Sequence, residues 1–232
     1  IASGPTCPDP STFADALGIV EKYGIAQPAR VARRLERGAK GMLAETPKPG
    51  DPAFECVHNF LIGSNRMACA AAARYLRRSG LWTKYLGSSL LGGPAHELGS
   101  LLAALDLPTR SAVVAGGETT VRLGRYRHGR GGRNQEAALA FALAAGAKRD
   151  GEDNSVVAAF MGTDGVDGNS DAAGALVSSR VYKLAGKIGA EKYLARHDSY
   201  RALKKIGSLI FTGPTGTNVN DIAILVNYRD VA

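Results

Sequence analysis

A basic, glycine-rich loop at residues 129–136 has the residue types and spacing that most directly suggest chemistry. It reads GRGGRNQE and leads into an alanine-rich segment that we expect to form a helix over residues 134–145. The first four backbone N–H groups of a helix have no partner within it, and the helix dipole places partial positive charge there. Arg130 and Arg133 beside these groups predict a site for a phosphate or a carboxylate, with a merely basic surface loop as the alternative.

Three further polar loops each follow a segment that we expect to be a strand. They read GGETT at residues 116–120, GTDGVDGNSD at 162–171 and TGPTGTN at 212–218. Ligands of α/β proteins collect at the carboxyl ends of strands. An ordinary turn explains each motif taken alone. Together, the four loops predict one shared pocket for a phosphorylated or multiply hydroxylated ligand.

The second of these loops is acidic, with Asp164, Asp167 and Asp171 close together. Carboxylates in such a loop can hold Mg²⁺ or accept a proton from a substrate hydroxyl. The alternative is that Asp171 caps the following helix and that the other two are turn residues. The residues leave both interpretations open.

Nucleophilic catalysis has no support in the sequence. There is no G-x-S-x-G elbow, and neither a Walker loop nor a G-x-G-x-x-G dinucleotide motif occurs. His58 lies in an apolar segment, where we expect a structural role. His96, His128 and His197 lie in helical or basic surroundings, and the sequence indicates no triad partner for any of them.

The elements that must position these loops follow from composition and pattern. The 232 residues are 45% hydrophobic and 22% charged, and short apolar runs alternate with alanine-rich amphipathic segments, which favours an α/β fold. We expect strands at 57–63, 83–91, 112–115, 156–161, 209–212 and 221–227, a hairpin-like segment at 119–123, and helices at 12–23, 28–38, 66–78, 95–105, 134–145, 178–188 and 190–205.

Charge and cysteine content restrict the classes of partner. The net charge is +8, and five basic residues recur at helical spacing between Arg30 and Lys40. A nucleic-acid surface is the alternative to a solvated helix face, but no aromatic residues or binding motif accompany the charge, so we expect no nucleic-acid partner. No apolar run approaches the roughly 20 residues of a membrane span, so we expect no membrane association. Three cysteines without a C-x-x-C pair indicate a cytoplasmic protein with reduced thiols.

Several of these motifs together resemble a known family. SGPT-x-PDP near residue 3, GGETTV, GRGGRNQE, GTDG-x-DG-x-x-DAAGA and GPTGTNVND follow one another along the whole chain. This pattern is similar to that of the glycerate 2-kinase family that carries the MOFRL domain. The resemblance implies transfer of the ATP γ-phosphoryl group to the 2-hydroxyl of D-glycerate, with Mg²⁺. Some relatives carry a hydroxypyruvate reductase label, and a non-catalytic module that binds an anion or a nucleotide is a further alternative.

The resemblance also implies an architecture. Family members have two α/β lobes with the active site in the cleft between them. The chain resembles the carboxyl-terminal lobe, a mixed sheet flanked by helices. The preceding Rossmann-like lobe, with its catalytic lysine and phosphate loop, is then a partner that this chain lacks, and activity of this half alone stays open. We expect a linker and α/β segment at 1–108 and a MOFRL-like domain at 109–232, which can form one compact lobe, and a homodimer is compatible with this architecture.

Roles for individual residues follow from the resemblance, position by position. Arg133, and after it Arg130, would neutralise charge on the transferred phosphoryl group, with Asp164 as a further catalytic residue. Asp164 and Asp167 would contact Mg²⁺ or a substrate hydroxyl. Residues implied in binding the substrate or nucleotide are Ser3, Thr6, Gly116, Gly117, Glu118, Thr119, Asn134, Thr215, Thr217 and Asn218.

Overall fold

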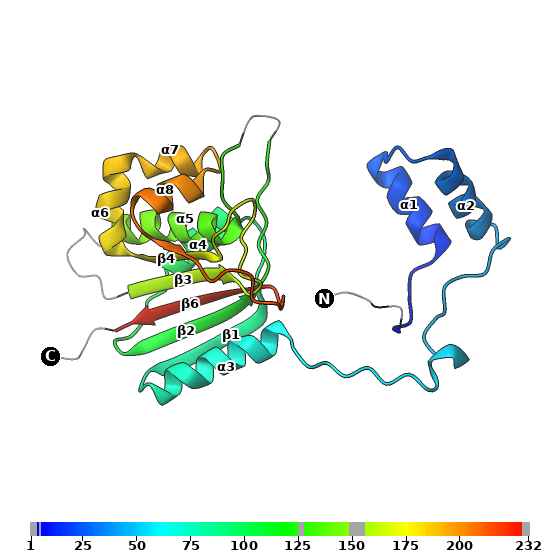
Figure 1. The fold of residues 1–232 in the computed structure, drawn as a ribbon, viewed down its shortest axis with the longest axis horizontal. Helices are drawn as coiled ribbons and strands as arrows, with labels where there is room; N and C mark the ends of the chain where they lie inside the picture. The colour runs from blue at the N-terminus through cyan, green and yellow to red at the C-terminus, as the bar shows by residue number, and fades with distance from the viewer. Residues whose placement is uncertain (1–3, 5, 125–127, 149–155, 229–232) are drawn as a thin grey trace. The chain divides into compact units, whose positions relative to one another are not determined.

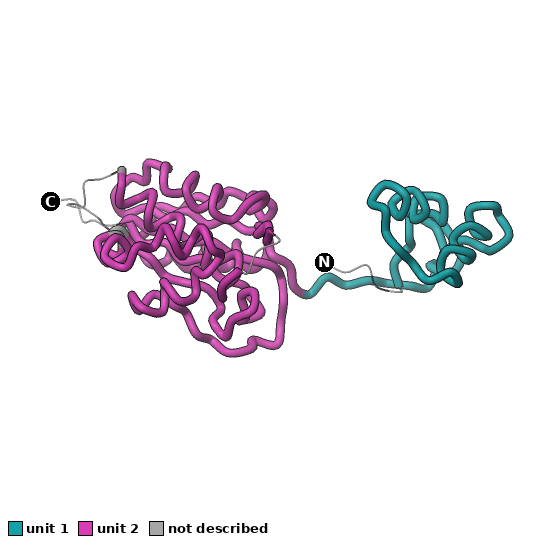
Figure 2. The backbone as a smooth tube through the Cα atoms, turned by 90° about the horizontal axis from the view of Figure 1, so that it is seen from above, with its two compact units in different colours: residues 1–62 teal, residues 63–232 magenta. Residues whose placement is uncertain are grey.

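The chain forms two compact units, residues 1–62 and residues 63–232, which Figure 2 colours separately. The predicted boundary between residues 108 and 109 lies inside the second unit, because segment 63–108 contributes a strand to the same sheet as the later segments. The computed structural model describes residues 4, 6–124, 128–148 and 156–228.

The first unit contains the two helices that the sequence predicts. They are α1 (Phe13–Tyr23) and α2 (Ala29–Ala39), and a short 3₁₀ turn, η1 (Pro52–Phe54), follows. Thr12 and Asp15 form a capping box at the start of α1, and Gly24 ends the helix in the left-handed conformation. These are the local signals that define the ends of α1, whereas α2 follows Pro28 and has no side-chain cap.

The second unit is a mixed six-stranded sheet with helices on both faces (Figure 1). The strand order is β1-β2-β6-β3-β4-β5, with β1 parallel to β2 and every other neighbouring pair antiparallel. The predicted fold class, a mixed sheet flanked by helices, is confirmed. The strands are β1 (Trp82–Leu91), β2 (Ser111–Gly117), β3 (Val156–Gly162), β4 (Gly174–Ser178), β5 (Leu209–Ile210) and β6 (Asp221–Asn227), and the helices are α3 (Asn65–Arg78), α4 (Ala95–Ala103), α5 (Arg133–Lys148), α6 (Ser179–Ile188), α7 (Ala190–Leu194) and α8 (Ser199–Lys205).

Strand β2 is buried along its whole length because both of its faces are covered. Val113 and Ala115 pack into the large core that contains α4 and α5, whereas Val114 packs with Cys69 and Ala73 of α3. Successive side chains of a strand point to opposite faces, so this division places α3 on the face opposite α4 and α5. Within the described residues, no helix combines the length and the apolar composition that crossing a bilayer requires.

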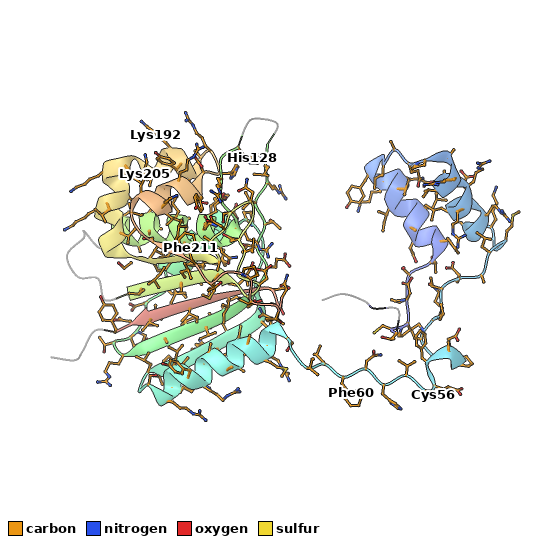
Figure 3. The ribbon with its side chains drawn as sticks, in the orientation of Figure 1. Cys56, Phe60, His128, Lys192, Lys205 and Phe211 are labelled. Carbon is orange, nitrogen blue, oxygen red and sulfur yellow. The ribbon has the colours of Figure 1, made fainter. Side chains whose placement is uncertain are left out.

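Three predicted elements differ from the structure, one of them the single helix expected at 190–205, which is divided into α7 and α8. Residues 57–63 pair with no strand in the described part of the chain, and Phe60, labelled in Figure 3, is 84% exposed there. The segment 119–123 forms a single bridge, between Thr120 and Pro94, and no hairpin. Strand β4 was not predicted. An apolar run is equally compatible with a strand and with an exposed segment, because pattern alone does not reveal whether a pairing partner exists.

Close packing of α4 against α5 depends on Gly99. A Cβ atom at this position would lie 2.1 Å from the backbone oxygen of Ala137, which cannot move without disturbing α5. The absence of a side chain therefore lets the two helix backbones approach closely. Because α5 carries several of the candidate site residues, this contact also sets where those residues lie.

We expect Gly99→Ala to lower the free energy of unfolding by about 1–3 kcal/mol, because the methyl group overpacks the contact between α4 and α5. Gly186→Ala on the exposed face of α6 is the matched control, since an added Cβ there meets nothing within 4 Å. It should raise stability by up to about 1 kcal/mol through helix propensity. Urea unfolding of the two variants measures both effects, and equal stability of the two would contradict this packing argument.

Candidate functional site

The candidate site lies at one end of the sheet, where the carboxyl ends of β2 and β3 lie beside the amino end of β6. Strands β2 and β3 are both antiparallel to β6, so their carboxyl ends lie beside its amino end. Gly117 and Gly162 are the register partners of Asp221 from either side. The loops that leave these strands gather at this end of the sheet in Figure 1. The predicted convergence of polar loops on one edge therefore has a topological basis.

Arg133, the first residue of α5, is held between two carboxylates. Its Nε donates to Oδ2 of Asp221 over 2.5 Å, and its second terminal nitrogen donates to Oδ1 over 3.1 Å. The other terminal nitrogen lies 2.9 Å from Oε1 of Glu118. The hydrogen bond to Asp221 is the main cause that raises the pKa of Arg133, and the nearby carboxylates add to it against the effect of burial. Arg133 is therefore a fixed, permanently charged group.

The amino terminus of α5 already has an anion, the side chain of Asp167. Its Oδ1 accepts from the backbone and side-chain nitrogens of Asn134, both at 3.1 Å, and its Oδ2 accepts from those of Gln135 at 2.8 and 3.0 Å. The carboxyl group is 2% exposed, and burial raises its pKa against the opposing effect of these hydrogen bonds.

This arrangement corrects three predictions. Both oxygens of Asp167 are used within the protein, so Asp167 is a structural cap rather than the predicted magnesium ligand. The helix N–H groups that were expected to bind a phosphate donate to that carboxylate. Asn134, expected to contact the substrate or nucleotide, is 4% exposed and bonded to the same group.

The glycines of the basic loop allow other protein segments to pack closely against it. A Cβ atom at Gly129 would lie 2.2 Å from Asp198, one at Gly131 would lie 2.3 Å from the hydroxyl of Ser199, and one at Gly132 would lie 2.3 Å from Asp167. Sequence reasoning interpreted these glycines as making room for a bound anion. The structure shows that each of these glycines also packs closely against another protein segment, although the loop lines a cavity on its open side.

Arg130 points to a different place from Arg133. Its terminal nitrogen donates to Oδ1 of Asp171 over 2.8 Å, and its guanidinium lies 4.0 Å from the centre of the Tyr200 ring. A hydrogen bond from Tyr200 is the main cause that lowers the pKa of Asp171. Asp171 does not cap the next helix, because β4 lies between Asp171 and the start of α6 after Ser178.

A cavity of about 640 Å³ opens beside Arg133, and three of the four polar loops line it. Glu118 and the buried Thr119 come from the first loop, Gly132 and Arg133 from the basic loop, and Gly168 from the acidic loop. Glu136 on α5 and His197, between α7 and α8, complete the polar part of the wall. Arg130 and the loop at 212–218 do not line this cavity.

The fourth loop forms a second polar cluster around Asp164. The backbone N–H of Thr215 donates to the carbonyl of Asp164 over 3.1 Å, and the amide of Asn218 donates to Oδ2 of Asp164 over 3.3 Å. The hydroxyl of Thr215 donates to the carbonyl of Thr163 over 2.6 Å and lies 3.1 Å from that of Thr217. In the part of the chain that the structure describes, no three His, Cys, Asp or Glu side chains gather as a metal site. Asp164 therefore offers one carboxylate rather than a complete ligand set.

The remaining predicted binding residues lie apart from the cavity. A Cβ atom at Gly116 would lie 1.7 Å from Oδ1 of Asn65, and one at Gly117, with φ of 144°, would lie 2.3 Å from the backbone of Leu91. These two glycines therefore allow close packing of α3 and β1 against β2. Thr6 belongs to the first unit, where its hydroxyl donates to Asn59, and Ser3 lies outside the described residues.

Sequence reasoning missed three residues of the site. Asp221 is 1% exposed, and its carboxylate orients Arg133. Glu136 is 3% exposed, and its Oε2 lies 2.8 Å from Nδ1 of His197, so this histidine has an acidic partner after all. Asp221 follows a polar loop directly, which is a usable signal. Glu136 and His197 are separated by 61 positions, and no local sequence pattern predicts their contact.

We expect Asp167→Asn to lower the free energy of unfolding by about 2–3 kcal/mol, because one accepting oxygen becomes an NH₂ group that faces donors. Asp106→Asn, at an exposed position, is the control and should change stability little. Urea unfolding with matched slopes provides the measurement. A loss no larger than that of the control would contradict the capping role.

Comparisons with known proteins support the family resemblance that the sequence motifs indicate. Residues 111–221 match the MOFRL family, and residues 1–36 match a domain of unknown function, DUF4147. The chain is 42% identical to a glycerate 2-kinase of Pyrococcus horikoshii, covering 97% of this chain and 52% of that protein. It is 40% identical to a D-glycerate 2-kinase of Thermotoga maritima, with 97% and 52% covered. A putative hydroxypyruvate reductase of Agrobacterium vitis is 42% identical, with 97% and 51% covered.

A solved structure is similar as well. The crystal structure of a glycerate kinase of Thermotoga maritima superposes with a TM-score of 0.79 at 38% identity, covering 98% of this chain and 53% of that one. The chain thus spans about half the length of the curated relatives it matches. The agreement in motifs, sequence and fold leads to one conclusion: the chain belongs to the glycerate 2-kinase family that carries the MOFRL domain.

Proposed function

We propose that this chain forms the carboxyl-terminal part of a glycerate 2-kinase, which transfers the γ-phosphoryl group of ATP to the 2-hydroxyl of D-glycerate. The names of its relatives support this assignment. The single observation in the structure that carries it is Arg133, a cation fixed at the wall of a cavity by two carboxylates.

Phosphoryl transfer depends mainly on positioned positive charge, because little covalent chemistry is left to the protein. A guanidinium has five N–H donors, and the contacts with Asp221 and Glu118 use three of them. Two donors therefore remain for the oxygens of a phosphoryl group. Arg130, bonded to Asp171 and stacked on Tyr200, is the weaker candidate for this role.

Magnesium enters the proposal through Asp164. Mg²⁺ in phosphoryl-transfer sites is usually bound by one or two carboxylates together with substrate phosphates and water. One partly exposed carboxylate that accepts a single hydrogen bond at each oxygen from the described residues fits that pattern. When bound, the ion would neutralise charge on the phosphates. Thr215, Thr217 and Asn218 would then shape the polar wall beside it.

The proposal also includes the partners of this chain and its location in the cell. The relatives are about twice as long as this chain, so we propose that an amino-terminal lobe completes the site for ATP and D-glycerate. The three cysteines are free, as expected of a protein in the reducing cytoplasm. A homodimer remains a prediction from the sequence.

The direct test measures ADP release from D-glycerate and MgATP. The chain is assayed alone and joined to the amino-terminal half of the Thermotoga maritima relative. We expect activity in the joined protein, and Arg133→Ala should lower kcat/KM by about 10³-fold. Arg133→Lys keeps a charge beside the buried Asp221 but loses the fork geometry, so it should fold normally and still lose most activity.

Arg78→Ala is the matched control, because Arg78 lies at the exposed end of α3 and does not line the cavity. Equal activity of the Arg133 and Arg78 variants would remove Arg133 from the mechanism. Phosphate-independent oxidation of NADH with hydroxypyruvate would favour the reductase alternative instead. Nucleotide binding without turnover would favour a non-catalytic module.

A second prediction concerns Glu118, whose half-exposed carboxylate shares Arg133 with the incoming anion. Glu118→Gln removes one competing negative charge, so we expect the KM for the anionic substrates to fall by about two- to fivefold, the scale of an exposed ion pair. Glu97→Gln on α4 serves as the control. Steady-state kinetics at constant ionic strength provide the measurement, and a rise in KM would show that Glu118 instead contributes to substrate binding.

A further inference from the structure

Glu136 is a buried carboxylate that contacts two histidines. Its side chain projects from α5, its Oε2 lies 2.8 Å from Nδ1 of His197, and its Oε1 lies 3.7 Å from Nδ1 of His96. The first contact is a hydrogen bond, and the second is a looser ion-pair contact. His197 lines the cavity beside Arg133, whereas His96, from the first turn of α4, does not. Of the two histidines, only His197 lines the cavity, beside Glu136 itself.

The backbone at His197 is held in an unusual conformation. Its φ of 52° lies in the left-handed region, which a small minority of residues other than glycine adopt, most often asparagine, aspartate and histidine. The turn is fixed by hydrogen bonds from the N–H of His197 to Leu194 and from the N–H of Asp198 to Tyr193, at 3.0 and 2.9 Å. Unusual backbone held in this way is concentrated at functional sites.

The contact with Glu136 determines which ring nitrogen of His197 carries a proton. An ionised carboxylate only accepts hydrogen bonds, so with Glu136 ionised the contact requires the proton of a neutral ring to be on Nδ1. The other nitrogen, Nε2, then keeps its lone pair and can accept a proton. A buried carboxylate that orients an imidazole and stabilises its charged form is the arrangement found in catalytic acid–histidine pairs.

We propose that His197 is the proton acceptor for the attacking hydroxyl and that Glu136 is its positioning residue. This inference rests on the proposed kinase function. The 2-hydroxyl of D-glycerate loses its proton to Nε2 as its oxygen forms a bond to the γ-phosphorus, and the bond from that phosphorus to the leaving oxygen of ADP breaks. The imidazolium, paired with Glu136, later releases the proton to solvent. No oxidant or further reactant is required.

The kinetic test uses the joined enzyme and the variant His197→Gly. Glycine adopts the left-handed backbone without strain, so the turn should persist, and the variant leaves a space that free imidazole can enter. We expect kcat to fall by about 10²-fold or more, with KM changed less than about threefold, and added imidazole to restore part of the lost kcat. His58→Gly, at an exposed position of the first unit, is the control and should show neither effect.

The positioning role of Glu136 has its own readout. Long-range ¹H–¹⁵N spectra of the labelled chain report which nitrogen of His197 is protonated, independently of turnover. We expect the Nδ1–H form in the parent, its loss in Glu136→Gln, and a shift of the Nε2 resonance when D-glycerate is added. His197→Gly activity equal to the parent, or an Nε2–H form in the parent, would overturn the proposal.

These two arms separate the inference from the function on which it rests. An inactive joined enzyme contradicts the kinase proposal, and the spectra then decide the state of His197. An active enzyme whose His197→Gly variant loses kcat without any rescue by imidazole points to a structural role and overturns the proton acceptor.

Discussion

The carboxylate of Asp167 at the amino terminus of α5 is the interaction on which the site depends. It accepts four hydrogen bonds from Asn134 and Gln135, and it is almost completely buried. Because Asp167 lies in the loop after β3, this contact ties that loop to the start of the helix. Arg133 immediately precedes the bonded residues, and Glu136 immediately follows them. The carboxylate of Asp167 thus fixes the start of α5, from which Arg133 and Glu136 reach the cavity.

The same logic extends to the other charged groups of the site. Arg133 is oriented by Asp221, Arg130 by Asp171, and His197 by Glu136. Each of these three groups has a carboxylate partner from a distant part of the sequence. Such pairing limits the conformational freedom of long side chains, so little ordering is left for the moment of ligand binding. It also lowers the net positive charge that the cavity presents.

Sequence reasoning succeeded where local signals decide the structure. The capping box at Thr12 and the left-handed Gly24 define α1, and apolar runs defined β2, β3 and β6. It failed where the answer depends on a distant partner. The apolar run at 57–63 has no strand beside it in the described part of the chain, and the glycines of the basic loop pack against Asp167, Asp198 and Ser199. A glycine in a sequence indicates that there is no room for a side chain, but only the structure shows which atoms lie close to it.

The place of β6 in the sheet has a consequence for how the protein is made. It is the last strand in sequence among the described residues, yet it lies between β2 and β3 in the middle of the sheet. During synthesis, β2 and β3 emerge from the ribosome well before the strand that joins them. Until then their edges are unpaired, and exposed edges of this kind invite association with other chains. The nascent lobe is therefore most vulnerable to aggregation between the synthesis of β3 and that of β6, and a chaperone that shields these two edges would act in that interval.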